Sequence, residues 1–155
     1  SNSVEQTGSE ADCSHGRPVY YSWYEFYPAY PVNYSNTVQP GDHFSASVTS
    51  NGSGKYTLVL SDTTAGWTHT TTGTASSATN ASAEAIAEAP SSNRGVLPLA
   101  DFRTVTFTNV TVNGAALGTV PTANRLTMVT SGGATKASTS ALTTNNTFTV
   151  TWQHS

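Results

Sequence analysis

Apolar and polar residues alternate with a period of two along much of the chain, which is typical of β-strands with one buried face. The longest alternating run covers residues 18–27, where one face carries Val19, Tyr21, Trp23, Glu25 and Tyr27. Further strands are predicted at 44–48, 55–61, 66–72, 103–112 and 147–152, separated by Gly-, Pro- and Asn-containing turns. About eight such strands predict an all-β sandwich.

Residues 82–89 are ambiguous, because their Ala and Glu residues favour a helix. The segment is short and ends at Pro90, and its neighbours all have strand patterns. Interpreted as a strand, it places Glu84, Ile86 and Glu88 on one face.

The composition supports this fold class and narrows the function. The 155 residues suit one domain covering 1–155, and they include 20 Ser and 27 Thr but few strong helix formers. A net charge of −3 without a basic cluster argues against nucleic-acid binding. No apolar run is long enough to span a membrane, and the single cysteine, Cys13, excludes an internal disulfide. We expect any export signal to lie outside this chain.

Only 10% of the residues are charged, which affects the stability expected of the protein at acidic pH. Acid unfolds proteins largely through charge repulsion and the loss of paired carboxylates. With only 6 Lys and Arg and 4 His residues, this chain gains little positive charge in acid. The composition therefore favours a secreted protein adapted to acidic surroundings, although cell-surface adhesins share it.

Few residues are available for acid–base chemistry. The four histidines are scattered without metal-ligand spacing, and no Gly-x-Ser-x-Gly elbow occurs. The carboxylates are more informative, because Glu25 lies between Trp23 and Tyr27 on one strand face, while Glu84 and Glu88 share another. Such acids either hydrogen-bond to aromatic neighbours without further function, or line a cleft for a polysaccharide or a peptide.

Three blocks of the chain resemble the glutamic peptidase (eqolisin) family of bacterial and fungal acid endopeptidases. They are the Gln-Thr-Gly block at 6–8, the Trp-Tyr-Glu-Phe-Tyr-Pro block at 23–28 and the Ala-Glu-Ala-Ile-Ala-Glu block at 83–88. The run at 99–109 is also similar, so the resemblance covers most of the chain in order. It implies a concanavalin-like β-sandwich of two curved antiparallel sheets and a secreted enzyme acting on polypeptide substrates.

The resemblance also implies roles for individual residues. The family's catalytic Gln falls on Gln6 and its catalytic Glu on Glu88, with Glu84 as the alternative base. Cleft residues fall on Trp23, Glu25 and Tyr27, and Glu10 replaces an Asp that supports the Gln.

In the implied mechanism the Glu activates water and later protonates the leaving amine, while the Gln amide stabilises the oxyanion. A glutamic acid with a reference pKa of about 4.3 can act as a base in mild acid, where a histidine would be protonated. No metal or cofactor is required.

Three departures and two rival functions accompany this hypothesis. The family domain begins with further strands, so we expect either that an N-terminal segment is missing, removed or on a separate chain that completes the fold, or that this member is reduced. Ala85 replaces a Trp of many relatives, and Glu10 replaces Asp. The rivals are a non-catalytic carbohydrate-binding sandwich, and a glycan hydrolase that pairs Glu25 with Glu88.

Overall fold

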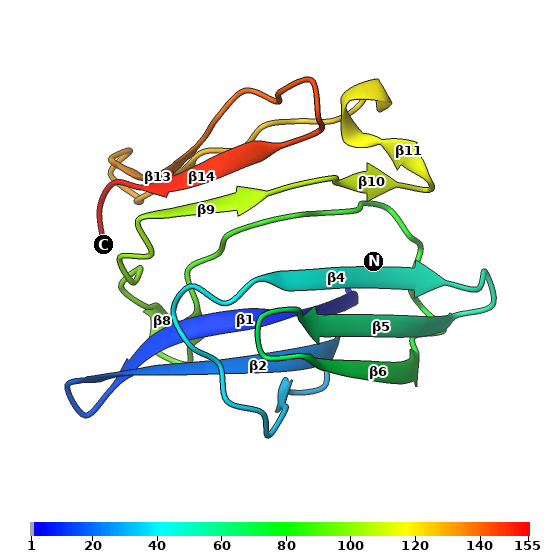
Figure 1. Cartoon of the computed structure of the whole chain (residues 1–155), viewed down its shortest axis with the longest axis horizontal. Helices are drawn as coiled ribbons and strands as arrows, with labels where there is room; N and C mark the ends of the chain where they lie inside the picture. Colours follow the sequence, from blue (N-terminus) through cyan, green and yellow to red (C-terminus); the bar gives the residue numbers. More distant parts are fainter. Residues whose placement is uncertain (1) are drawn as a thin grey trace. The chain divides into compact units, whose positions relative to one another are not determined.

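The computed structural model describes residues 2–155, and its regular structure is almost entirely antiparallel β-sheet (Figure 1). The chain forms two compact units. The first extends to Ser82 and the second spans Ala83–Ser155. That residues 1–155 act as one domain stays a prediction.

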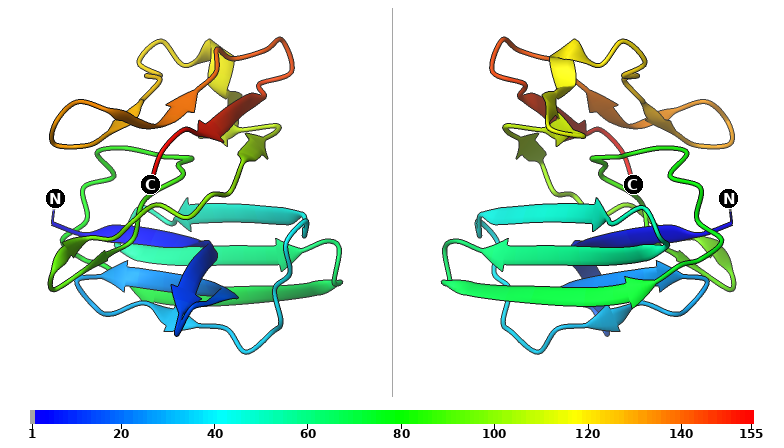
Figure 2. Two further views of the ribbon diagram at one scale, coloured as in Figure 1. Left: turned by 90° about the vertical axis from the view of Figure 1, so that its left-hand side faces the viewer. Right: turned by 90° about the vertical axis from the view of Figure 1, so that its right-hand side faces the viewer.

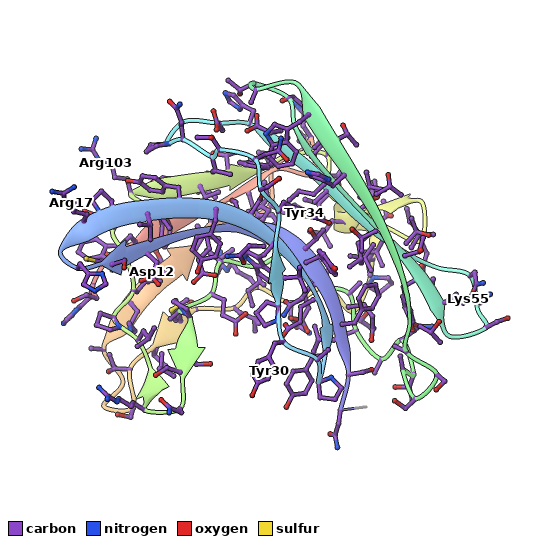
Figure 3. The ribbon with its side chains drawn as sticks, turned by 90° about the horizontal axis from the view of Figure 1, so that it is seen from below. Asp12, Arg17, Tyr30, Tyr34, Lys55 and Arg103 are labelled. Atoms are coloured by element: carbon purple, nitrogen blue, oxygen red, sulfur yellow. The ribbon has the colours of Figure 1, made fainter. Side chains whose placement is uncertain are left out.

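The first unit begins with a long hairpin of β1 (Val4–Ser14) and β2 (Arg17–Tyr27), extended by β3 (Val32–Asn33) beside β2. A two-residue turn joins the long strands, and both of its residues, His15 and Gly16, have positive φ angles (52° and 74°). Turns of this kind match the twist of paired strands. Figure 3 shows the hairpin as a bent ribbon with Asp12 and Arg17 close to its turn.

A second sheet of the first unit contains β4 (Phe44–Ser50), β5 (Lys55–Asp62) and β6 (Trp67–Thr74), which lie side by side in Figure 2. Its inner face buries Tyr56, Leu58 and Leu60 of β5. The register places Gly73 beside Tyr56 on this face, where the ring of Phe26 covers it. The Phe26 face of the hairpin therefore packs on the sheet, and the opposite face of the hairpin points away from it.

The segment after β3 is fixed to β6 by aromatic and polar contacts. Tyr34 stacks on His69 with ring centroids 4.1 Å apart, and its hydroxyl hydrogen-bonds to Thr71 at 2.7 Å. The Nε2–H of His69 donates to the Oδ1 of Asn36 at 2.6 Å. These contacts hold the connection between the two sheets.

The second unit is built from short strands. A four-stranded sheet orders them as β12 (Met128–Val129), β13 (Thr135–Thr139), β14 (Phe148–Trp152) and β9 (Thr104–Phe107). Two small hairpins pair β7 (Ser91–Ser92) with β8 (Gly95–Val96), and β10 (Thr111–Val112) with β11 (Ala115–Ala116), which a 3₁₀ turn (Leu117–Thr119) follows. The core consists of Leu99, Ala137, Phe148 and Val150 with partly buried neighbours.

Most strands predicted from the pattern are confirmed, but three expectations need correction. Residues 82–89 form neither strand nor helix, because Ala and Glu provide little side-chain surface for a pleated sheet. The run at 103–112 is divided into β9 and β10, since Asn109 adopts a positive φ of 54° that interrupts a strand. The pattern also predicted no strand before residue 18, where β1 lies.

Gly73 is the position where the packing of the first unit can be tested. A Cβ at this residue would overlap the ring of Phe26, so Gly73→Ala forces the ring to move. We expect a loss of about 1–3 kcal/mol in the free energy of unfolding, measured by urea titration. Gly8→Ala is the control, because its Cβ meets Trp23 at an ordinary 3.9 Å. Equal losses for the two variants would contradict the packing.

Candidate active site

One face of the β1–β2 hairpin collects most of the predicted site residues. The register pairs Gln6 with Glu25, Gly8 with Trp23, and Glu10 with Tyr21. Because directly opposed residues of an antiparallel pair share a face, these six side-chain positions lie on the same side of the hairpin. The same face also carries Val4 opposite Tyr27, and Asp12 opposite Val19.

The central pair of this face is joined by a side-chain hydrogen bond. The Nε2–H of Gln6 donates to Oε2 of Glu25 at 2.5 Å, and both residues are half-buried. An ionised carboxylate only accepts hydrogen bonds, so it selects the NH₂ side of the amide and turns the Gln6 carbonyl oxygen away. Glu25 therefore fixes which way the Gln6 amide points.

Glu10 lies directly opposite Tyr21 in the β1–β2 ladder, and its support of Gln6 stays a prediction. Burial raises the pKa of Tyr21 well above its usual value, and the nearby carboxylates of Glu10 and Asp12 raise it further. Tyr21 thus remains a proton donor throughout the acidic and neutral range.

Trp23 lies between these two polar pairs. The Cζ2 atom of its indole is 3.9 Å from where a Cβ of Gly8 would be, so the ring covers the glycine opposite it. The indole Nε1 is buried and has no hydrogen-bond partner among residues 2–155. At the end of the face, Tyr27 is 49% exposed.

The two remaining predicted acids, Glu84 and Glu88, belong to the second unit. Both are exposed in the irregular segment 82–89. Ala87 and Ala89, on either side of Glu88, pack against the core of this unit, whereas the neighbours of Glu84 are exposed. Glu88 is therefore held at a more anchored position than Glu84. Its convergence with Gln6 stays a prediction.

Two further findings concern the chemistry of the described chain. Among residues 2–155, no three His, Cys, Asp or Glu side chains come together as metal ligands. In the same residues, no helix has the length and apolar character needed to cross a membrane.

The family is decided by sequence comparison. Residues 1–152 match the Peptidase A4 family. The chain belongs to this family. The resemblance to glutamic peptidases inferred from the three sequence blocks is therefore confirmed.

Two individual proteins are similar to this Peptidase A4 member. Aspergillopepsin-2 from Aspergillus niger is 35% identical over 121 residues, which are 74% of this chain. The match covers 43% of that relative, less than half of its length. The crystal structure of aspergilloglutamic peptidase from Aspergillus niger matches this chain with a TM-score of 0.81 at 26% sequence identity. The match covers 98% of this chain and 91% of the chain in that crystal structure. The predicted all-β sandwich class is confirmed by this likeness.

Sequence reasoning did not single out Tyr21, which lies on the same face as the predicted site residues. The alternation placed it on the same face as Trp23 and Glu25, but a tyrosine in an alternating strand is usually a packing residue. The available signal was its position two residues before Trp23 on a face that also carries an acid.

Ionisation of Tyr21 is expected to lower the stability of this Peptidase A4 chain at alkaline pH. Because folding raises the pKa of Tyr21, its neutral hydroxyl stabilises the fold below about pH 10, and this contribution is lost as the pH rises further. We expect the stability difference between the wild-type chain and Tyr21→Phe to shrink between pH 8 and pH 11 in urea titrations. Glu10→Gln should weaken this effect. A difference that stays constant over the interval would contradict the assignment.

Proposed function

We propose that this chain is the catalytic domain of a glutamic endopeptidase, which hydrolyses peptide bonds of polypeptide substrates at acidic pH. Gln6 and Glu88 form the catalytic pair of this proposal. The observation that carries it is the hydrogen bond from Gln6 to Glu25, in a chain that belongs to the Peptidase A4 family. An amide held in one orientation on a partly open sheet face is the kind of preorganised donor that acyl-transfer sites use.

Gln6 acts as the oxyanion donor in this proposal. A primary amide has two N–H groups, and Glu25 accepts only one of them. Because both N–H groups belong to one planar amide, the bond to Glu25 also fixes the direction of the second N–H. This second N–H donates to the oxyanion that forms when water attacks the scissile carbonyl. Because an amide does not titrate, Gln6 keeps both N–H groups in acid.

Glu88 acts as the general base and then as the general acid. It removes a proton from the attacking water and transfers it to the nitrogen of the leaving amine, so the two steps balance without a covalent intermediate. Its alanine neighbours, which pack against the core of the second unit, support this choice over Glu84. Glu84 is the alternative base.

Secretion into an acidic medium is part of the proposal. The low charge content supports it, because few ionic contacts are lost when carboxylates protonate. Trp23 and Tyr27, on the same face as Gln6, supply apolar surface for substrate side chains. A separate N-terminal segment or chain that completes the fold stays a prediction of the family resemblance.

The proposal is tested by cleavage of an acid-denatured protein at pH 3 and at pH 7. We expect cleavage at pH 3 and little at pH 7. Gln6→Ala should lower kcat roughly 100- to 1,000-fold through loss of the oxyanion donor. Glu88→Gln should lower kcat roughly 100- to 10,000-fold, because the base is lost.

Two control variants sharpen this experiment. Gln39→Ala removes an amide from an exposed position elsewhere in the first unit and should leave kcat unchanged. Glu84→Gln should also retain activity, and a loss equal to that expected for Glu88→Gln would transfer the base role to Glu84. Acid proteolysis that survives both Gln6→Ala and Glu88→Gln would overturn the catalytic assignment. Glycan binding without proteolysis would favour the carbohydrate-binding alternative.

A further inference from the structure

The Gln-Thr-Gly block of β1 contacts the Trp-Tyr-Glu block of β2 at three points. The side chain of Gln6 binds that of Glu25. The hydroxyl of Thr7 donates a hydrogen bond to the backbone carbonyl oxygen of Trp23 at 2.7 Å. Gly8 lies opposite Trp23, and the indole covers it. These two blocks, which carry much of the family resemblance, are therefore joined residue by residue across the hairpin.

Thr7 makes its hydrogen bond from behind the face that carries the candidate site. Successive side chains of a strand point to opposite faces, so Thr7 shares the packed face of the hairpin with Tyr24, the residue opposite it. The ring of Tyr24 lies 5.3 Å from that of Tyr34, centroid to centroid, within the first unit. Thr7 is thus not placed to contact a substrate, and its effect on the site passes through the backbone of Trp23.

No hydrogen bond within residues 2–155 holds the indole of Trp23 in place. Its N–H is buried and has no partner there. The ring is located by its packing over Gly8, where its Cζ2 atom is 3.9 Å from the position of a Cβ. A glycine inside a strand loosens the strand, because it has no side chain to pack. The position of the ring therefore depends on how firmly the Trp23 backbone is held beside Gly8.

We infer that Thr7 is a positioning residue of the proposed site. Its hydroxyl, on the residue next to Gly8, binds the carbonyl of Trp23 and so holds the indole over this glycine. The ring then lies on the same face as Gln6 and Glu25, one pair further along the hairpin. Without the hydroxyl, the strands lose this side-chain crosslink, and the ring can move away from the glycine. The inference rests on the proposed function for its effect on substrate.

Two substitutions of Thr7 separate the hydrogen bond from simple packing. Thr7→Val keeps the branched shape and the strand preference of threonine but lacks the hydroxyl. Thr7→Ser keeps the hydroxyl but lacks the methyl group. If the hydrogen bond positions Trp23, Thr7→Val is the defective variant, whereas a packing role makes Thr7→Ser the defective one. Thr70→Val is the matched control, because Thr70 is exposed on β6.

The placement of the ring can be observed without any activity. The chain has three tryptophans, so the indole N–H resonance of Trp23 is assigned by its loss in Trp23→Phe and followed by ¹H–¹⁵N NMR in the intact chain. We expect Thr7→Val to shift this resonance and to speed its hydrogen exchange about two- to tenfold, as the loss of one hydrogen bond allows. Thr7→Ser and Thr70→Val should leave the resonance unchanged.

Kinetics at acidic pH then connect the ring to the substrate. Because Trp23 supplies apolar surface for the substrate and Gln6 performs the chemistry, the defect should appear in KM. We expect Thr7→Val to raise KM about two- to tenfold and to change kcat less than about twofold. Thr7→Ser should restore the KM of the wild-type chain.

The outcomes separate this inference from the proposed function. An unchanged Trp23 resonance in Thr7→Val overturns the inference, and so does a shifted resonance with an unchanged KM. Thr7→Ser can overturn it without the valine variant, because a shifted resonance in this hydroxyl-bearing chain would show that the methyl group positions the ring. If the wild-type chain shows no acid proteolysis, the proposed function fails, and the resonances alone decide whether Thr7 positions Trp23.

Discussion

The register of β1 against β2 is the constraint on which the candidate site depends. It places Gln6 directly opposite Glu25, so that two side chains nineteen residues apart in sequence form a hydrogen bond. A slip of one residue would turn Gln6 toward the face that carries Phe26 and covers Gly73. The burial of Phe26 against Gly73 opposes such a slip, because it commits the other face of the hairpin to the interior of the first unit.

Glu25 and Asp62 accept hydrogen bonds from neutral donors. Oε2 of Glu25 accepts from the Gln6 amide. Oδ1 of the buried Asp62 accepts from the backbone N–H groups of Thr64 and Ala65 in the turn that follows β5, while its Oδ2 has no hydrogen-bond partner among residues 2–155. A neutral donor keeps its proton in acid, so each of these contacts depends on the titration of one group instead of two. This arrangement is consistent with a chain that has few charges and a proposed function at acidic pH.

The sequence predicted those parts of the fold in which side-chain burial alternates. The strands β5 and β14 have apolar residues at every second position, and these residues line their buried faces. The polar strand β1 was missed, because it is held by pairing with β2 and not by an apolar face of its own. The segment 82–89 shows the opposite error, since alternation of Glu with Ala does not supply a surface that a sheet can bury.

The same distinction applies to the site. Motifs predicted Gln6, Trp23 and Glu25 as site residues, but only the structure shows that Gln6 binds Glu25 and that Glu10 lies opposite Tyr21. The register depends on a two-residue turn at His15 and Gly16, whose φ angles a pattern of apolar residues does not encode. The pairing of residues across strands could therefore not be predicted from the sequence.

A double-mutant cycle in kcat/KM at acidic pH tests most directly whether Glu25 acts by orienting the Gln6 amide. The cycle compares Gln6→Ala, Glu25→Ala and the double variant with the wild-type chain. If Glu25 works through Gln6, the double variant loses no more activity than Gln6→Ala alone. Losses that add on the logarithmic scale would show that the two residues act independently and would contradict the account.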